Sequence, residues 1–403
     1  MKVLQINAVY GIGSTGRMTM ELHNYMNDHG IESYVSCSQA CIISDPHQIP
    51  IGSPLDVRIH SFMGRLTGLQ GYFSKTATKK ILTEIDKIKP DIIHLGNLHS
   101  NYLCVNLLLD YIVDHDIPTV IVLHDCWFYT GKCSHYTIDG CNSWENKCGN
   151  CPRLKKDIPS WFFDRTEKML KDKAERLSRI KKLGVIGVSD WITNEAKKSI
   201  LKDALIIESI HNWIDTDVFK PDQTQANALK RRLGLEGKKV ILGVSNLWSN
   251  AKGLDVFIQL SRVLKEDETI ILVGNVGRTN LPQNILNIPP TEQVEELVGY
   301  YTMADVFLQL SPEETFGKVV AEAMACGTPV IVVNSTANPE LISDDTGYVC
   351  EVGDLKSIRS RLEQIFKAPK EKYSIACRRY SQLEFNRDVQ MGKYVAFYNR
   401  LLK

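Results

Sequence analysis

The segment from 311 to 333 reads Ser-Pro-Glu-Glu-Thr-Phe-Gly-Lys-Val-Val-Ala-Glu-Ala-Met-Ala-Cys-Gly-Thr-Pro-Val-Ile-Val-Val. This order of residues predicts a loop, a short helix opened by Gly317 and a buried strand over 330–333. Gly327 is placed to cap the end of the helix, and Pro329 stops it. The segment therefore has the character of a parallel α/β sheet, in which ligands bind beyond the carboxyl ends of the strands.

Two carboxylates of this segment, Glu314 and Glu322, lie before and inside the predicted helix. The start of a helix exposes backbone N–H groups that attract anions, most often phosphate. A carboxylate two turns further in can accept hydrogen bonds from a pair of sugar hydroxyls, and one before the helix can reach the other end of the same ligand. The spacing predicts a nucleotide-sugar site. The alternative is that Glu322 pairs with Lys318 on the helix surface, which contributes roughly a few tenths of a kcal/mol.

Bulk composition restricts the class of protein. The chain has 403 residues, which is about right for two domains of similar size. Its formal net charge of +1 gives no indication of the basic surface that nucleic-acid-binding proteins have. We find neither an apolar run of the roughly 20 residues that span a bilayer nor a signal-peptide core, so we expect a cytoplasmic protein. In that compartment, the 11 cysteines should be mostly reduced thiols or metal ligands.

A glycine motif, Gly11-Ile-Gly13-Ser-Thr-Gly16, follows the first predicted strand and opens a helix that runs to about His29. The motif is typical of dinucleotide sites. Such a site needs an acidic residue at the end of the second strand, and the strand over 34–38 ends without one. A tight turn that requires glycine explains the motif as well.

Strands and helices then alternate along the chain. Apolar runs over 91–95, 119–123 and 184–188 predict buried parallel strands, with helices near 76–89 and 102–115 between them. A second set begins at Lys239. His124 comes at the end of one strand, while His94 and His99 come at the end of another. A lone histidine at a strand end is more often a satisfied polar group than a ligand.

The segment around the two carboxylates resembles the Glu-x7-Glu signature of family 4 glycosyltransferases, which are retaining enzymes. The residues that carry the resemblance are Glu314, Phe316, Gly317, Glu322, Ala323, Met324, Ala325, Gly327, Pro329 and Val330. It implies the GT-B fold, which is α/β with two doubly wound Rossmann-like domains facing a cleft. It also implies transfer of a sugar from a nucleoside diphosphate to an acceptor hydroxyl, as in surface polysaccharide or glycoconjugate synthesis.

The resemblance also suggests domain bounds. Residues 1–211 would form an acceptor-side domain with an insertion at 126–163, and residues 212–385 would bind the nucleotide sugar. Residues 386–403 would form a helix that returns to the first domain. The partners would be a nucleotide-sugar donor and a carbohydrate or lipid-linked acceptor.

Carried over residue by residue, the family pattern implies two sets of functional residues. The catalytic set comprises His124, Lys252 and Glu314. The donor-binding set comprises Gly11, Gly13, Gly274, Ile288, Thr315, Phe316, Gly317, Lys318 and Glu322. The family's diphosphate-binding arginine is absent, because Asn246 and Ala251 occupy its candidate positions; Arg278 and Lys318 are the nearest cations that could replace it. We expect no cofactor for the chemistry.

The insertion carries Cys133, Cys141, Cys148 and Cys151 with the spacing C-x7-C-x6-C-x2-C. It resembles an insertion found in a subset of family 4 enzymes after the His-Asp pair. The C-x2-C half has zinc-knuckle spacing, and the loop has few aliphatic residues from which to build a core. A structural zinc site is therefore one prediction. Free thiols, or disulfides in an oxidising compartment, are the alternatives.

A basic segment over 164–183 follows the insertion and predicts a long amphipathic helix. A solvated face is its usual explanation, and peripheral contact with an anionic membrane is the minority interpretation. Three other functions remain open for the whole chain: a non-hydrolysing nucleotide-sugar epimerase, a nucleotide-sugar-binding protein with a decayed site, and, more remotely, an NAD-linked dehydrogenase.

Overall fold

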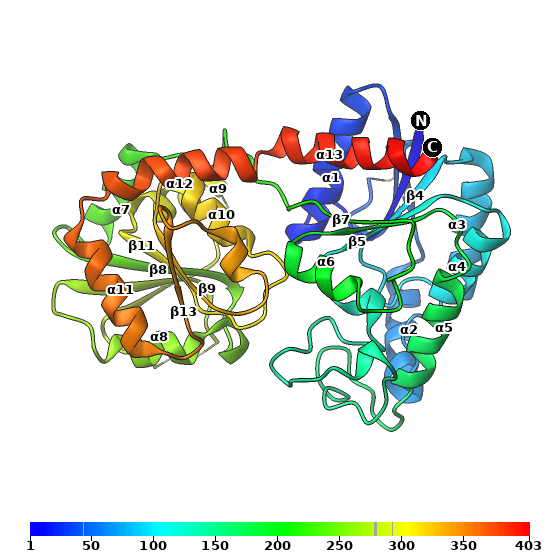
Figure 1. Ribbon diagram of the computed structural model, residues 1–403, viewed down its shortest axis with the longest axis horizontal. Coiled ribbons are helices and arrows are strands. Elements are labelled where there is room, and N and C mark those ends of the chain that lie inside the picture. The colour runs from blue at the N-terminus through cyan, green and yellow to red at the C-terminus, as the bar shows by residue number, and fades with distance from the viewer. Residues whose placement is uncertain (43, 278–279, 292) are drawn as a thin grey trace. The chain divides into compact units, whose positions relative to one another are not determined.

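The structure is a computed structural model that describes residues 1–42, 44–277, 280–291 and 293–403. The chain divides into two compact units. Unit 1 comprises Met1–Ile210 with Met391–Lys403, and unit 2 comprises His211–Gln390. Each unit contains one parallel sheet with helices on both sides, as Figure 1 shows. This confirms the predicted doubly wound α/β class.

The sheet of unit 1 has seven parallel strands in the order β3-β2-β1-β4-β5-β6-β7. Three central strands, β4 to β6, are buried along their whole length, as expected for continuous apolar runs covered on both faces. The strands are β1 (Lys2–Val9), β2 (Glu32–Gln39), β3 (Gln48–Pro50), β4 (Ile92–Leu95), β5 (Thr119–Leu123), β6 (Leu183–Gly187) and β7 (Ile206–Ser209).

The helices of unit 1 begin and end where local chemistry favours it. For example, Ser53 and Asp56 form a capping box at the start of α2, where Pro54 stands, and Gly68 ends the helix in the left-handed conformation. The helices are α1 (Gly13–Asp28), α2 (Pro54–Thr67), α3 (Lys75–Ile88), α4 (Val105–Asp114), α5 (Thr166–Leu177), α6 (Asp190–Ala196) and the part of α13 (Arg387–Leu402) from Met391 on.

The sheet of unit 2 has six parallel strands in the order β10-β9-β8-β11-β12-β13. They are β8 (Lys239–Leu247), β9 (Glu268–Asn275), β10 (Ile285–Ile288), β11 (Val306–Gln309), β12 (Val330–Val333) and β13 (Gly347–Cys350). The helices are α7 (Gln223–Arg232), α8 (Leu254–Ser261), α9 (Val294–Met303), α10 (Lys318–Ala325), α11 (Leu355–Lys367) and α12 (Glu371–Glu384).

The basic helix after the insertion is shorter than predicted. It ends at Leu177 rather than near Leu183, because Leu183 already pairs with Thr119 as the first residue of β6. The charged sequence between these two positions could not show where the helix stops.

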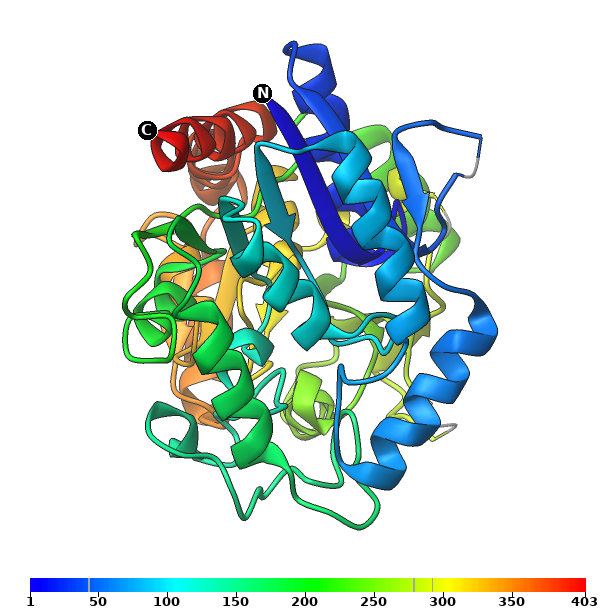
Figure 2. The same cartoon turned by 90° about the vertical axis from the view of Figure 1, so that its right-hand side faces the viewer.

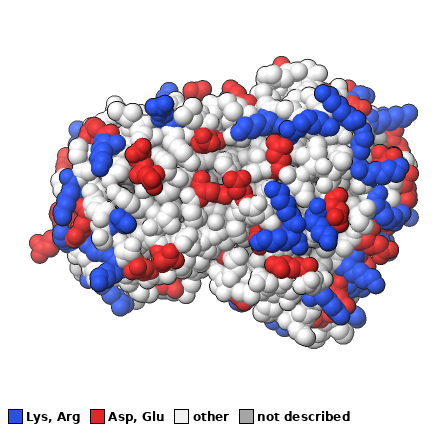
Figure 3. Space-filling view, viewed as in Figure 1, with Lys and Arg blue, Asp and Glu red and all other residues white. Residues whose placement is uncertain are grey.

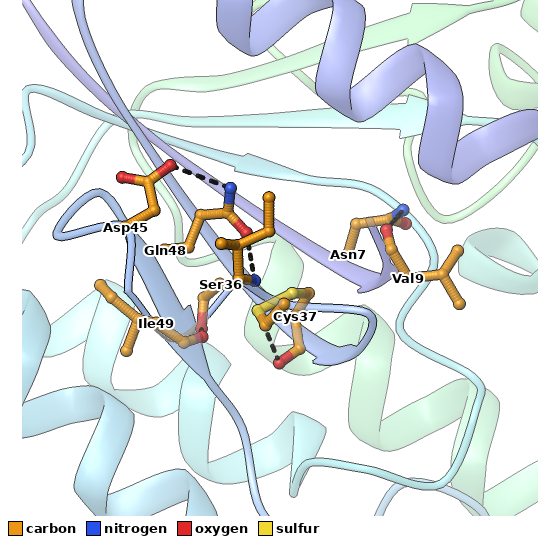
Figure 4. Close-up of a disulfide and its surroundings, with 9 residues drawn as sticks. Asn7, Val9, Ser36, Cys37, Asp45, Gln48 and Ile49 are labelled. Carbon is orange, nitrogen blue, oxygen red and sulfur yellow. Dashed lines mark hydrogen bonds between the residues drawn. A yellow bond between two sulfur atoms is a disulfide. The ribbon is translucent and has the colours of Figure 1, made fainter. Parts of the chain in front are cut away.

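One disulfide departs from the expectation of mostly reduced cysteines. Cys37 near the end of β2 is bonded to Cys41, with the two Cα atoms 5.9 Å apart (Figure 4). Beside it, the Ser36 hydroxyl donates to the carbonyl oxygen of Ile49, and the Gln48 amide donates to Asp45. The other nine cysteines are free thiols.

Both signs of charge occur on the face of each unit that Figure 3 shows. Figure 3 shows lysine and arginine interspersed with acidic side chains on the visible face of each unit, in keeping with the net charge of +1. Within the described part of the chain, every helix is too short or too polar to cross a membrane.

Candidate functional site

The carboxyl edge of the sheet in unit 2 gathers most of the predicted donor-binding residues. Lys252 lies in the loop after β8, Gly274 near the end of β9, and Ile288 at the end of β10. Glu314 lies in the loop after β11. Because all six strands are parallel, these loops share one edge, where α/β sheets bind ligands.

Two predicted catalytic residues of this edge contact each other. The ammonium of Lys252 donates to Oε1 of Glu314 at 2.5 Å. Lys252 keeps 39% of its side-chain surface exposed and Glu314 16%, so the pair is reached from solvent chiefly through the lysine. The sequence could not show this contact between residues 62 positions apart.

Hydrogen bonds hold the loops after β8, β11 and β12 together. The hydroxyl of Ser311 donates to the carbonyl oxygen of Ala251 at 3.0 Å, and Asn338 donates to the carbonyl oxygen of Ser311 at 2.9 Å. The backbone N–H of Glu314 donates to the Thr336 hydroxyl at 3.0 Å. The site is therefore positioned by three loops rather than by one motif.

The N-terminus of α10 adds a group of backbone donors to this edge. Gly317 stands before the first turn at a φ of +87°, which glycine tolerates and other residues rarely adopt. As the N-cap residue, Gly317 has no side chain with which to cap the helix. Its first residue, Lys318, is half-buried, as is Thr315 before it. This arrangement suits a phosphate group.

Phe316, one of the predicted donor-binding residues, directly precedes Gly317 at the start of α10. Its side chain is buried, and its ring lies 5.4 Å from that of Phe385 and 5.8 Å from that of His211. Because the ring is part of the core of unit 2, only the backbone of Phe316 can contribute to a ligand site.

Glu322 sits on α10, half-buried, and accepts a hydrogen bond from a buried tyrosine. The hydroxyl of Tyr301 in α9 lies 2.8 Å from Oε2 of Glu322. Burial raises the pKa of Tyr301 well above its usual value, and the Glu322 carboxylate adds to the rise. Tyr301 therefore remains a hydrogen-bond donor that fixes this carboxylate.

Gly274 is required by the packing of the backbone. A Cβ atom at this position would lie 1.6 Å from the carbonyl oxygen of Ser245, so β8 and β9 approach too closely for any other residue. Arg278, one of the two cations considered as replacements for the missing arginine, lies outside the described residues. Asn246 and Ala251 are exposed at the same edge.

The predicted residues of unit 1 lie at the carboxyl edge of its own sheet. Gly11 stands between β1 and α1, Gly13 is the first residue of α1, and the N-cap residue Ile12 makes no side-chain cap hydrogen bond. His124 directly follows β5 and is half-buried. His94, in contrast, is a core residue: Nδ1 lies 2.6 Å from the hydroxyl of Tyr398 in α13, and burial lowers its pKa to about 3.

A second pair at this edge was not singled out from the sequence. His99 Nε2 lies 2.7 Å from Oδ2 of Asp125, and both side chains are mostly buried. Burial lowers the pKa of His99, but the Asp125 carboxylate more than reverses this, so the net change is a rise. Burial also raises the pKa of Asp125, while His99 and the backbone N–H of Trp127 bring it below its usual value. The sequence signal that could have identified this pair is Asp125, the acidic residue directly after His124.

The predicted zinc site is not supported by the arrangement of the thiols. One small cavity of about 20 Å³ is lined by all four cysteines, Cys133, Cys141, Cys148 and Cys151. The sulfur atoms of Cys133 and Cys151 lie 4.0 Å apart. Within the described chain, no group of three or more histidine, cysteine, aspartate or glutamate residues is arranged to hold a metal ion. The spacing predicted four thiolates around one zinc ion; the four cysteines do line one cavity, but their arrangement does not support the metal site.

Buried lysines and aromatic rings hold the insertion together instead. The ammonium of Lys132 donates to the carbonyl oxygens of Arg153 at 2.9 Å and of Leu154 and Lys156 at 3.1 Å. Lys173 of α5 donates to two carbonyls of the same loop, and burial lowers its pKa to about 7. The rings of Tyr129, Tyr136 and Trp144 pack together with centroids 5.0 to 6.2 Å apart.

Comparison with solved structures identifies the fold. Sucrose-phosphate synthase from Thermosynechococcus elongatus has a TM-score of 0.71 and 16% identity, covering 99% of this chain and 98% of that one. HepE from Anabaena, solved in complex with UDP, has a TM-score of 0.70 and 14% identity, covering 99% of this chain and all of the other. At this identity the similarity concerns the fold, which is GT-B.

Sequence comparison identifies relatives and the family as well as the fold. N-acetyl-alpha-D-glucosaminyl L-malate synthase from Bacillus anthracis is 34% identical over 197 residues, which are 45% of this chain and 50% of the relative. The matched region thus spans about half the length of that curated relative. Residues 238–368 match the family described as Glycosyl transferases group 1. Residues 15–218, just over half of the chain, match Glycosyltransferase Family 4. The chain belongs to glycosyltransferase family 4.

Proposed function

We propose that this protein is a retaining glycosyltransferase that moves a sugar from a nucleoside diphosphate to an acceptor hydroxyl. The observation that carries the proposal is the arrangement at the carboxyl edge of the sheet in unit 2. There, the Lys252–Glu314 pair, the start of α10 at Gly317 and Glu322 occupy adjoining loops and one helix. Family membership supports the same reaction class.

Each group of this edge has a chemical role in the proposal. The diphosphate takes the N–H groups at the start of α10, together with Lys318 and Lys252. The ribose hydroxyls bind Glu322, whose carboxylate Tyr301 holds in place. The base lies near the backbone of Ile288, and the donor sugar near Glu314. The diphosphate competes with Glu314 for the ammonium of Lys252, which neutralises charge that grows as the bond to the sugar breaks.

Unit 1 supplies the acceptor side in this proposal. We assign His124 to the donor sugar because it ends β5 at the edge where such sheets bind ligands. Gly11 and Gly13 leave room for the donor diphosphate beside α1. The proposed domain bounds are 1–211 and 212–385, and the helix of 386–403 returns to the first domain.

The mechanism we propose needs no basic side chain. The leaving diphosphate accepts the acceptor proton on the face that it leaves, so the sugar keeps its anomeric configuration. The protein contributes the positions of the reactants and stabilisation of charge. An acceptor bearing a carbohydrate or a lipid-linked carbohydrate fits synthesis of a surface polysaccharide or glycoconjugate.

The first test is nucleotide binding followed by product analysis. UDP is the first probe, because the structurally similar HepE was solved with UDP, and GDP and ADP follow. We expect one of them to raise the melting temperature. Incubation of the matching nucleotide sugar should then release the nucleoside diphosphate. An intact nucleotide sugar with one inverted hydroxyl would instead identify an epimerase, and the absence of both binding and turnover would indicate a decayed site.

One observation still supports a structural metal in the insertion, which is that four thiols line one cavity. Metal analysis of protein purified without chelator decides the matter. About one zinc per chain would mean that the thiols turn toward one another around the ion. Metal-free protein with four titratable thiols in this loop would remove the proposal.

A further inference from the structure

Six large apolar side chains gather on the surface of unit 1. They are between 40% (Trp161) and 68% (Phe162) exposed. We call this set the aromatic patch; it comprises Leu55, Ile59, Phe62, Trp161, Phe162 and Phe163. Of the 12 phenylalanines and six tryptophans of the chain, all of which lie in the described part, four are exposed, and all four belong to the patch. Such concentration differs from the scattered apolar residues of an ordinary surface.

The helix that carries half of the patch turns its apolar side outward. In α2, Leu55, Ile59 and Phe62 recur at the spacing of one helix face and are exposed. The buried side instead carries His60 and Gly64. The backbone N–H of Gly71 donates to Nε2 of His60, so Nδ1 donates to the Ser74 hydroxyl, and burial lowers the His60 pKa to about 4. A satisfied histidine inside and an apolar face outside indicate that α2 faces something other than water.

The other half of the patch is fixed to the end of α2. The backbone N–H of Trp161 donates to the carbonyl oxygen of Arg65 at 2.8 Å, and the Ser160 hydroxyl donates to that of Phe163 at 2.6 Å. Gly68 approaches the Phe163 backbone so closely that a Cβ atom would lie 2.3 Å from its carbonyl oxygen. The rings of Phe62 and Trp161 meet edge to face, with centroids 5.7 Å apart. In Figure 2, α2 is the blue helix at the lower right. The three consecutive aromatics are thus held outward by an ordered backbone.

Cations surround the patch. Arg58 and Arg65 of α2 are exposed, and the Arg165 guanidinium lies 5.4 Å from the ring centre of Phe163. Two acidic side chains lie nearby, and both already bind protein groups. Asp56 caps α2 through Ser53, and Asp164 accepts from the backbone of Cys151 and from Thr166. Both carboxylates stay ionised, because these hydrogen bonds lower the pKa of Asp56 and of Asp164, so the three arginines against two aspartates leave a net charge of +1 at the patch.

We propose that the aromatic patch is a docking surface for an anionic lipid bilayer. Aromatic rings and arginines are the side chains that suit the boundary between headgroups and acyl chains, with the rings inserted and the cations at lipid phosphates. Aromatic residues and arginine are also enriched at protein interfaces, so a second copy of the chain is the competing occupant, and the test below measures it. The proposal goes beyond transferase activity, because docking needs neither donor nor acceptor.

The patch replaces the basic helix as the membrane-facing element. The basic side chains of α5 and the turn after it are mostly engaged within unit 1. Lys168 pairs with Asp172, Arg176 with Asp110, Arg179 with Asp114 and Lys181 with Asp116, while Lys173 is buried. Little positive charge of this segment remains for lipid.

The test uses the full chain and vesicles of phosphatidylcholine, alone or mixed with phosphatidylglycerol. We expect sedimentation with the anionic vesicles that weakens at high salt. Trp161 is the one exposed tryptophan, so its emission should shift to shorter wavelength on binding, and Trp161→Phe should abolish the shift. The double variant Phe62→Ser with Phe162→Ser should bind the vesicles about ten-fold less tightly.

Matched controls separate docking from folding. Ile375→Ser with Leu383→Ser removes two comparably exposed apolar side chains from α12 of unit 2, 75% and 62% exposed, and should leave binding unchanged. A nucleotide-induced rise in melting temperature that persists in the patch variant shows that the donor site is intact. Equal vesicle binding by both double variants would overturn the proposal. So would the absence of vesicle binding by the unmodified chain, or a dimer that the patch variant converts to monomer.

Discussion

Replacing Glu322 tests whether its carboxylate binds the nucleotide or only supports the structure. Its Oε2 accepts from the buried Tyr301 hydroxyl at 2.8 Å, and in our proposal the carboxylate also accepts from the ribose. Glu322→Ala removes both interactions. The variant leaves a buried hydroxyl without its acceptor, which costs about 1–3 kcal/mol of folding stability.

The effect on nucleotide binding follows from the same chemistry. A hydrogen bond to a charged group contributes about 1.5–3 kcal/mol. Loss of the ribose contact should therefore raise the dissociation constant of the nucleoside diphosphate roughly ten- to hundred-fold. Isothermal titration with whichever of UDP, GDP and ADP binds the unmodified chain measures this directly.

Two companion variants make the result interpretable. Glu322→Gln keeps an acceptor oxygen for Tyr301 while it removes the charge, so it should fold normally and bind nucleotide more weakly. Tyr301→Phe removes the structural bond and keeps the carboxylate, so it should lower stability more than affinity. If Glu322 served only the helix surface or Tyr301, Glu322→Ala would lower the melting temperature and leave the dissociation constant unchanged, and the ribose assignment would fail.

Three further predictions concern the rest of the chemistry. Glu314→Ala should reduce turnover more than nucleotide affinity, because its partner Lys252 still reaches the diphosphate; equal losses in both would place Glu314 in nucleotide binding instead. Transfer should persist in EDTA, and activity lost there and restored by Mg²⁺ or Mn²⁺ would show that the lysines do not suffice. The raised pKa of His99 and the lowered pKa of Asp125 make their pair stabilising above about pH 4 and below about pH 6.5, with the contribution lost as the pH rises through the pKa of His99 or falls through that of Asp125. The stability difference between the unmodified chain and Asp125→Asn should therefore be largest near pH 5–6, about 1.5–3 kcal/mol, and a difference that stays constant up to about pH 9 would contradict the assignment.

Local pattern was sufficient for the elements of the fold. The run over 119–123 was predicted as a buried strand and is one, because four consecutive apolar residues after Thr119 fit a strand covered on both faces. The helix after Gly317 was equally predictable from its glycine, its apolar stripe and its stop signal. These features depend on neighbours along the chain.

Features that depend on distant residues could not be predicted. The sequence indicated only that His94 ends a strand, because its partner Tyr398 is 304 positions away, on a helix that covers the sheet. The contact between Lys252 and Glu314 and the support of Glu322 by Tyr301 have the same origin. In α2, periodicity alone would place Leu55, Ile59 and Phe62 in the core, and only the structure shows them outside.

The central claim is that the chain transfers a sugar with retention from a nucleoside diphosphate donor. Proton NMR of a reaction with the nucleotide sugar whose nucleotide binds most tightly tests it most directly, because one spectrum identifies the products and their anomeric configuration. We predict release of the nucleoside diphosphate and a first-formed sugar product with the anomeric configuration of the donor, at a rate that Glu322→Ala lowers. A first-formed product of inverted configuration, or an epimerised but intact nucleotide sugar, would contradict the account.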